Sequence, residues 1–169
     1  LYRTHAPVGW SRIEGPLRPR AYRASELGEA SVPGEYLAAR VQMLENDDVK
    51  LHMARLAAPM PYYFRNADSD ELLFVHQGAG RLETDFGPLA YEPGDYLLIP
   101  RGTTHRLHPT SATSLLVIES ASEVAFPDKG MLGQHALFDP AVLRVPTPNE
   151  ASSLAADARG EWEVRIQRE

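Results

Sequence analysis

The sequence predicts an all-β domain, either an antiparallel sandwich or a barrel. Between residues 46 and 125, short apolar segments recur at even spacing, and a turn containing Gly or Pro separates each from the next. Several of these segments alternate apolar and polar residues with the period of two that is typical of a strand with one buried face. No segment of this region keeps an apolar period of 3.6 residues, so no helix is expected there.

The expected strands follow one another closely along the chain. The first lies at 49–54, where Val49, Leu51 and Met53 alternate with Lys50 and His52. Turns with the sequences GAG (78–80), GP (87–88), EPGD (92–95) and PRG (100–102) separate most of the others. Further strands are expected at 71–76, 81–86, 89–91, 96–99, 104–107 and 113–119. A last strand is expected at 162–167, where the sequence WEVRIQ alternates.

The chain divides into three parts. Residues 1–45 are rich in Pro, Gly and Arg, and they predict an extended N-terminal arm that lies along the domain or reaches over a neighbouring subunit. Residues 46–125 form the expected barrel core. Residues 126–169 are expected to wrap the barrel before the final strand. Because the chain starts without Met and stops within an expected strand, we interpret it as a piece of a longer protein.

Composition excludes several classes of function. The net charge is −6, and such a surface repels phosphate backbones, so no nucleic-acid partner is expected. No apolar run approaches eighteen residues, so no membrane span is expected. The chain has no cysteine, which removes disulfides, thiolate metal sites and a Cys nucleophile together and is compatible with a cytoplasmic location.

One short motif names a fold family. Gly94, five residues, Pro100-x-Gly102, two residues and His105 reproduce the second of the two sequence signatures of cupin barrels. The two glycines allow turn geometries that a Cβ would obstruct, and Pro100 presets φ at the turn. The strand between the turns then places His105 on the inner wall of the barrel. The chain therefore resembles the cupins, which implies a double-stranded β-helix, also called a jelly-roll barrel.

The first cupin signature is incomplete. It consists of His-x-His, three or four residues, Glu, six residues and Gly, and only its second half is present, as Glu71 and Gly78. Depending on the gap, the two His positions are occupied by Arg65 and Ala67 or by Phe64 and Asn66. Neither pair supplies the neutral imidazoles that a metal-binding cupin needs, so no metal ligand is assigned in this chain.

The candidate pocket residues are therefore the polar groups that the two signatures place at the barrel mouth, namely Arg65, Asn66, Glu71 and His105. Glu71 and His105 are expected to hydrogen-bond to each other or to Arg65. For His52, which has no partner at ligand spacing, a structural role is expected. No catalytic and no cofactor-binding residue is assigned.

Four stretches resemble homogentisate 1,2-dioxygenases in the right order. They are YYFRNADSDELL (62–73), GRLETDFG (80–87), LYR (1–3) and FPDKGMLG (126–133). The departure at Ser69, where that family usually has Gly, falls in a turn. The chain is similar to the N-terminal cupin half of this family.

The resemblance implies a two-cupin enzyme of tyrosine and phenylalanine breakdown. Such an enzyme opens the ring of homogentisate with O2 at Fe(II) and gives maleylacetoacetate. The family's iron ligands, two His and a Glu, lie in the C-terminal cupin, so the resemblance implies Fe(II) in the full-length enzyme and none in this chain. It also implies a homo-oligomer.

Two alternatives stay open from the residues alone. The chain could be a metal-free cupin binding module that holds a small anionic ligand with Arg65, Asn66, Glu71 and His105. It could also be a small metal-dependent cupin enzyme that combines Glu71 and His105 with outside ligands.

Overall fold

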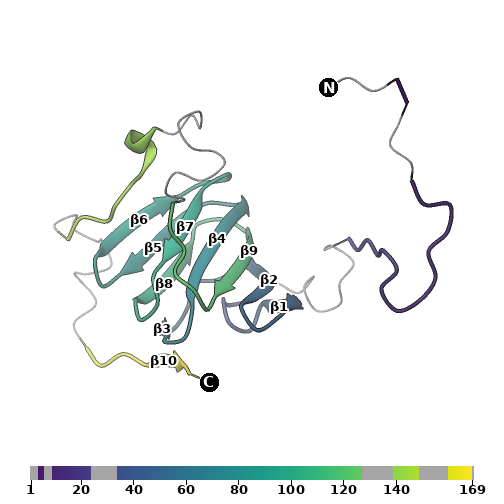
Figure 1. Ribbon diagram of the computed structural model, residues 1–169. Helices are drawn as coiled ribbons and strands as arrows, with labels where there is room; N and C mark the ends of the chain where they lie inside the picture. Colours follow the sequence, from purple (N-terminus) through teal and green to yellow (C-terminus); the bar gives the residue numbers. More distant parts are fainter. Residues whose placement is uncertain (1–3, 6–8, 24–33, 127–138, 149–159, 169) are drawn as a thin grey trace.

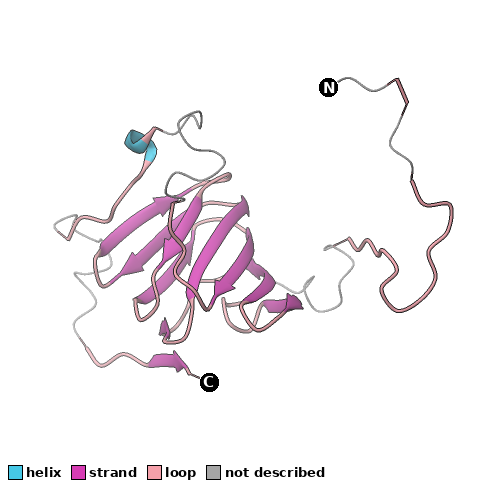
Figure 2. Ribbon diagram, in the orientation of Figure 1, coloured by secondary structure: helices cyan, strands magenta, loops and turns pink. Residues whose placement is uncertain are grey.

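Two five-stranded β-sheets pack against each other to form the body of the molecule (Figures 1 and 2). The computed structural model describes residues 4–5, 9–23, 34–126, 139–148 and 160–168. Sheet A has the strand order β1-β2-β9-β4-β7, and sheet B the order β10-β3-β8-β5-β6. Among the described residues, the one helical element is a single 3-10 turn, Pro140–Val142. None of the described helical segments is long and apolar enough to cross a membrane.

Sheet A contains the three longest strands. Its strands are β1 (Arg40–Glu45), β2 (Val49–Leu56), β4 (Asp70–Gln77), β7 (Tyr96–Ile99) and β9 (Thr113–Ser120). The strands of sheet B are β3 (Tyr63–Asn66), β5 (Gly80–Thr84), β6 (Gly87–Tyr91), β8 (Thr104–Pro109) and β10 (Val164–Gln167). β10 pairs with β3 in parallel, whereas the other pairs between these strands are antiparallel.

The order of the strands is that of a jelly roll. From β2 to β9 the chain crosses from one sheet to the other at every connection except the β5–β6 hairpin. Because β2, β4 and β9 lie side by side in sheet A, and β3, β5 and β8 in sheet B, segments distant in sequence form one barrel. The predicted all-β, cupin-type fold is therefore confirmed.

The eight strands expected from residue 49 onward are all present, with small shifts at their ends. Two strands were not predicted. β1 lies within the range 1–45 expected to be an arm, where it pairs with β2 through a register shift between Gln42 and Leu44. That irregularity breaks the alternation that would otherwise reveal a strand. β3 is only four residues long and contains a charged residue, so its pattern is too short to stand out.

The core lies between the two sheets and is formed by the inward residues of nearly every strand. Its fully buried large side chains include Leu56, Leu73, Leu82, Leu107 and Leu115. The turns of the second signature have the expected geometry, because Gly94 and Gly102 adopt positive φ angles of 95° and 81°. The tight turn at Gly102 therefore places β8, and with it His105, on the inner wall of the barrel.

Residues 4–5 and 9–23 of the N-terminal arm are exposed. Residues 9–23 contain no strand, and Trp10, Leu17 and Tyr22 expose 85%, 94% and 68% of their surface. In Figure 1 this part of the arm extends away from the barrel. The barrel itself begins near Tyr36, which is completely buried.

Candidate functional site

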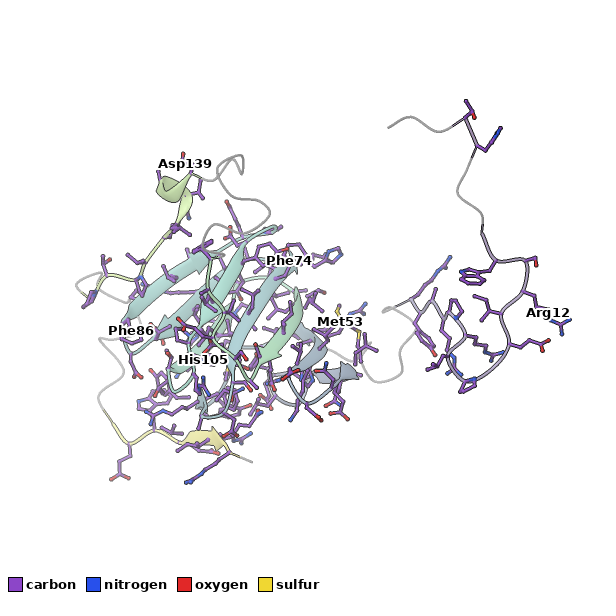
Figure 3. All side chains as sticks on the ribbon, in the orientation of Figure 1. Arg12, Met53, Phe74, Phe86, His105 and Asp139 are labelled. Atoms are coloured by element: carbon purple, nitrogen blue, oxygen red, sulfur yellow. The ribbon has the colours of Figure 1, made fainter. Side chains whose placement is uncertain are left out.

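A polar cluster lies inside the barrel, between the two sheets. Glu71 on β4 and His105 on β8 are the residues that the two signatures predict there, and both are fully buried. His105 Nε2 lies 3.7 Å from Glu71 Oε2, too far for a hydrogen bond. Figure 3 shows His105 among the side chains that fill the space between the sheets. The structure therefore brings Glu71 and His105 together, as predicted, although without the expected direct hydrogen bond.

A second buried carboxylate faces the first. Glu119 on β9 is directly opposite Glu71 on β4 in the register of sheet A, and it is only 2% exposed. Like charges opposite each other on neighbouring strands repel, and burial adds a desolvation cost for each carboxylate. This arrangement needs a cation between the two carboxylates.

The guanidinium of Arg40 supplies that cation. Arg40 stands on β1, and its side chain is 8% exposed. One terminal nitrogen lies 3.3 Å from Glu71 Oε1, and the other pairs with Glu119 Oε1. The planar guanidinium can bridge two carboxylates with separate N–H groups, which an ammonium group does less well. Arg40 is thus the centre of the cluster.

Tyr36 covers the cluster from the segment that precedes β1. Its hydroxyl donates a hydrogen bond of 3.0 Å to Glu71 Oε1. Its ring packs edge-on against Phe64 and His105, with centroids 6.2 Å and 6.1 Å apart. Burial, and then the neighbouring Glu71 carboxylate, raise the pKa of Tyr36, so the phenol stays protonated and remains a donor.

The residues at the two absent His positions do not fit a metal. Phe64 and Asn66 are the inward-facing residues of β3, so they occupy the His-x-His positions. Phe64 has no lone pair, and its ring packs 5.5 Å from that of His105. The Oδ1 of Asn66 accepts hydrogen bonds from the backbone N–H groups of Asp68 and Ser69, at 3.1 Å and 3.0 Å. Asn66 therefore holds the β3–β4 turn instead of offering its carbonyl oxygen to an ion.

Glu71 is poorly suited to hold a metal, because Arg40 and Tyr36 occupy its Oε1 atom and only Oε2 has no hydrogen-bond partner. A divalent cation beside the guanidinium would experience strong repulsion in this buried site. Among the residues that the structure describes, no three His, Cys, Asp or Glu side chains gather closely enough to hold a metal ion.

Arg65 was predicted to lie at this site, and the structure places it elsewhere. It alternates with the inward residues Phe64 and Asn66, so it lies on the other face of sheet B. There its Nε donates a 3.0 Å hydrogen bond to Thr104 Oγ1. The prediction that Arg65 pairs with Glu71 or His105 is therefore wrong, because a strand turns successive side chains to opposite faces.

An open pocket lies next to the cluster at one end of sheet A. Its volume is about 340 Å³. The lining consists of Leu37, Arg40, Gln42, Lys50, His52, Glu119 and Gln167. His52 Nε2 lies 3.8 Å from Glu119 Oε2, and Gln167 Nε2 donates a 3.3 Å hydrogen bond to the same oxygen. β10 therefore contributes Gln167 to the cluster. His52, for which a structural role is expected from the sequence, lies at the rim of this pocket.

His52 makes the stability of the domain depend on pH. Burial, together with the charges of Arg40 and Lys50, lowers the pKa of His52 to about 4. The acidic group nearest to His52 is Glu119. In the unfolded chain, the imidazole of His52 binds a proton below a pH of about 6.5. The unfolded state therefore binds more protons between these two values, and stability falls as the pH drops from about 6.5 toward 4. Burial also lowers the pKa of His105, which acts in the same direction.

We expect His52→Gln to reduce this pH dependence. Urea unfolding measured between pH 7 and pH 4 should show a smaller loss of stability in the variant than in the wild-type chain, with a remaining slope from His105. The matched control is His76→Gln, because His76 is exposed at the end of β4. Parallel stability curves for His52→Gln and the wild type would contradict this assignment.

Three residues of the cluster were missed by sequence reasoning. Arg40 and Tyr36 belong to the range predicted to be an arm. Glu119 did carry a signal, because it continues the alternation of Leu115 and Val117 on the buried face of β9. A charged residue at such a position predicts a buried partner.

Comparison with known proteins agrees with these observations. The model of the family described as Homogentisate 1,2-dioxygenase N-terminal matches residues 32–155. The chain belongs to this family. Of the four stretches that suggested it, 1–3 and most of 126–133 lie outside the described residues, whereas 62–73 and 80–87 form β3, β4, β5 and the turns beside them.

Individual proteins are also similar to this chain. A protein from Saccharolobus solfataricus named as a dioxygenase is 30% identical over 112 residues, 64% of this chain and 29% of its own length. The homogentisate 1,2-dioxygenase of Pseudomonas entomophila is 26% identical over 140 residues, 78% of this chain and 32% of its own length. A cupin-2 domain protein from Shewanella frigidimarina, a solved structure, is 18% identical with a TM-score of 0.46, over 53% of this chain and 86% of its own. The chain spans about a third of the length of the two curated relatives. It is a dioxygenase-related cupin domain.

Proposed function

We propose that this chain is the metal-free N-terminal cupin of a dioxygenase that opens the ring of homogentisate with O2. In this proposal, Fe(II) is held by another part of the protein. The full reaction joins one O2 to one homogentisate, breaks a ring carbon–carbon bond and places both oxygen atoms in maleylacetoacetate. This domain contributes folded support and assembly, not a chemical step.

One observation carries the proposal beyond the family match. Arg40 occupies the space between Glu71 and Glu119, and Phe64 and Asn66 occupy the His positions of the first signature. A protein charge and an aromatic ring thus take up the part of the barrel where a metal-binding cupin needs open coordination positions. Chemistry on O2 would require a metal centre elsewhere.

The experiment compares this chain with the longer protein that its gene encodes. We expect the longer protein, loaded with Fe(II), to consume one O2 per homogentisate and to give a product heavier by two oxygen atoms. This chain alone should consume none above the rate of free Fe(II). Turnover by this chain alone would contradict the proposal. So would a longer protein that oxidises gentisate and leaves homogentisate unchanged.

A second candidate function is the binding of a small anion at the open pocket. Lys50 and His52 line this pocket together with Arg40, which is the observation that favours it. Arg40 is already paired with two carboxylates, so its charge is largely compensated. Calorimetric titration of this chain with homogentisate tests the idea. Saturable binding that Lys50→Met weakens would support it, and the absence of a binding signal would exclude it.

A further inference from the structure

β10 is an exposed edge strand of sheet B. Three of its four residues are exposed, and none of them belongs to the core. It lies next to β3 in the sheet order and pairs with it in parallel, a pairing that is slightly less stable per residue than the antiparallel kind. Short segments with few buried contacts open at a low cost in free energy. We therefore expect β10 to leave the barrel while the core strands stay folded.

The main chain of β3 nevertheless receives β10 through regular pairing (Figure 1). At one end, the N–H of Tyr63 donates a 3.0 Å hydrogen bond to the carbonyl of Glu163. At the other end, the N–H of Ala67 donates a 3.0 Å hydrogen bond to the carbonyl of Gln167. The opposite edge of β3 pairs with β8, so β10 covers the one edge that would otherwise be open. Open sheet edges bind extended peptides by adding them as a further strand.

An aromatic side chain is recognised on the outer face of this edge. The ring of Trp162 packs edge-on against that of Tyr63, with centroids 5.8 Å apart. Arg106, on β8, places its guanidinium 4.6 Å from the centroid of the Trp162 ring and 5.5 Å from that of Tyr63. A guanidinium over an aromatic ring is attracted to its negative face. Tyr63 and Arg106 therefore form a platform that favours an aromatic residue.

A cation and an amide are recognised further along β10. The guanidinium of Arg165 lies 3.7 Å from the centroid of the Tyr62 ring. Tyr62 is buried and its hydroxyl donates to the carboxylate of Glu35, which adds a negative charge near this position. Two residues later, the side-chain amide of Gln167 donates a 3.3 Å hydrogen bond to the buried carboxylate of Glu119.

We propose that this edge of sheet B is a binding site for an extended peptide and that β10 occupies it in this structure. The partner is a peptide with an aromatic residue, a cation three positions later and an amide two positions after that, as in Trp162, Arg165 and Gln167. Val164 and Ile166 expose 45% and 57% of their surface, so the site does not select the residues at their positions. Main-chain pairing supplies affinity, and the side-chain contacts supply specificity. The residues of this site, which we call the β3 edge site, are Tyr62, Tyr63, Arg106 and Glu119.

The experiment offers the peptide to a chain whose own β10 cannot dock. Proline has no N–H and is not tolerated in a paired strand, so Arg165→Pro should free the β3 edge site. The probe is a fluorescent peptide with the sequence EWEVRIQR, residues 161–168. By fluorescence anisotropy, we expect saturable binding to Arg165→Pro and binding at least about tenfold weaker to the wild-type chain, where β10 competes. A scrambled peptide of the same composition should not bind.

Substitutions within the peptide test the specificity of the site. Trp162→Ala and Arg165→Ala in the probe should each weaken binding to the Arg165→Pro chain at least about tenfold. Ile166→Ala is the matched control, because Ile166 is mostly exposed in β10, and its effect should stay within about twofold. Equal binding of all three altered probes and the original would overturn the proposed recognition pattern.

A second variant of the chain protects the test against a folding defect in Arg165→Pro. The double substitution Trp162→Ala and Arg165→Ala keeps every backbone N–H and changes only exposed side chains, and it should also bind the peptide. Circular dichroism identifies which variants are folded. A folded variant that leaves the peptide unbound would overturn the proposal. Equal binding to the wild type and both variants, or tight binding of the scrambled peptide, would overturn it as well. None of these outcomes depends on the proposed oxygenase reaction.

Discussion

Arg40→Met is expected to destabilise the barrel by about 3–5 kcal/mol, the cost of leaving buried charges without their partner. Glu71 and Glu119 would then face each other inside the barrel with no cation between them. A domain of this size has about 5–15 kcal/mol of stability in total, so the variant should lose a large part of it. Chemical denaturation at pH 7 measures the loss directly.

The loss should depend on pH in a definite direction. Without the guanidinium, the two carboxylates repel each other and stay desolvated, and both costs exist only while the side chains are charged. The penalty is therefore present at neutral pH and smaller under acidic conditions that neutralise carboxylates. The gap between the variant and the wild type should narrow on acidification.

Two further variants separate this explanation from simple loss of packing. Arg12→Met removes an arginine whose ion pair with Glu14 is exposed, and it should change stability by less than about 1 kcal/mol. Combining Arg40→Met with Glu71→Gln and Glu119→Gln removes the unpaired charges and should recover much of the loss. An Arg40→Met variant as stable as the wild type would mean that the guanidinium does not hold the cluster together.

Tyr36→Ala should cost about 3–5 kcal/mol, which is typical for removal of a large aromatic side chain from a core. Tyr36 has no exposed surface, and it packs against Phe64 and His105 while donating to Glu71. Tyr36→Phe keeps the ring and removes only the hydroxyl, so it should cost about 1–3 kcal/mol, because Glu71 loses one donor in a buried site.

The control for Tyr36 comes from the arm. Tyr22→Ala changes a tyrosine that is mostly exposed, and its effect should stay within about 0.5 kcal/mol. Thermal and urea unfolding of the three variants give the ranking. If Tyr36→Ala unfolded like Tyr22→Ala, the segment before β1 would not be part of the barrel.

The sequence predicted the fold well because each signal was local. The period-two alternation in β2 and β9 and the turns at Gly94 and Gly102 report on neighbouring residues alone, and the structure contains all of them. It also predicted that Glu71 and His105 meet, since the two cupin signatures describe one site in separate pieces. Such motifs encode a long-range contact that pattern reading would otherwise miss.

The cluster residues that the sequence did not predict are placed by contacts that no local pattern indicates. Arg40 and Glu71 are 31 residues apart, and Tyr36 and Glu71 are 35 apart. The misplacement of Arg65 has a different cause, because a one-residue shift on a strand moves a side chain to the other face.

Metal binding by this chain tests most directly the claim that Arg40 and Phe64 replace a metal centre. The purified chain would be titrated with Fe(II) without oxygen, passed through a desalting column and analysed for iron and protein. We predict far less than one iron per chain, with no difference between the wild type and His105→Ala. One iron retained per wild-type chain and lost in His105→Ala would contradict the account.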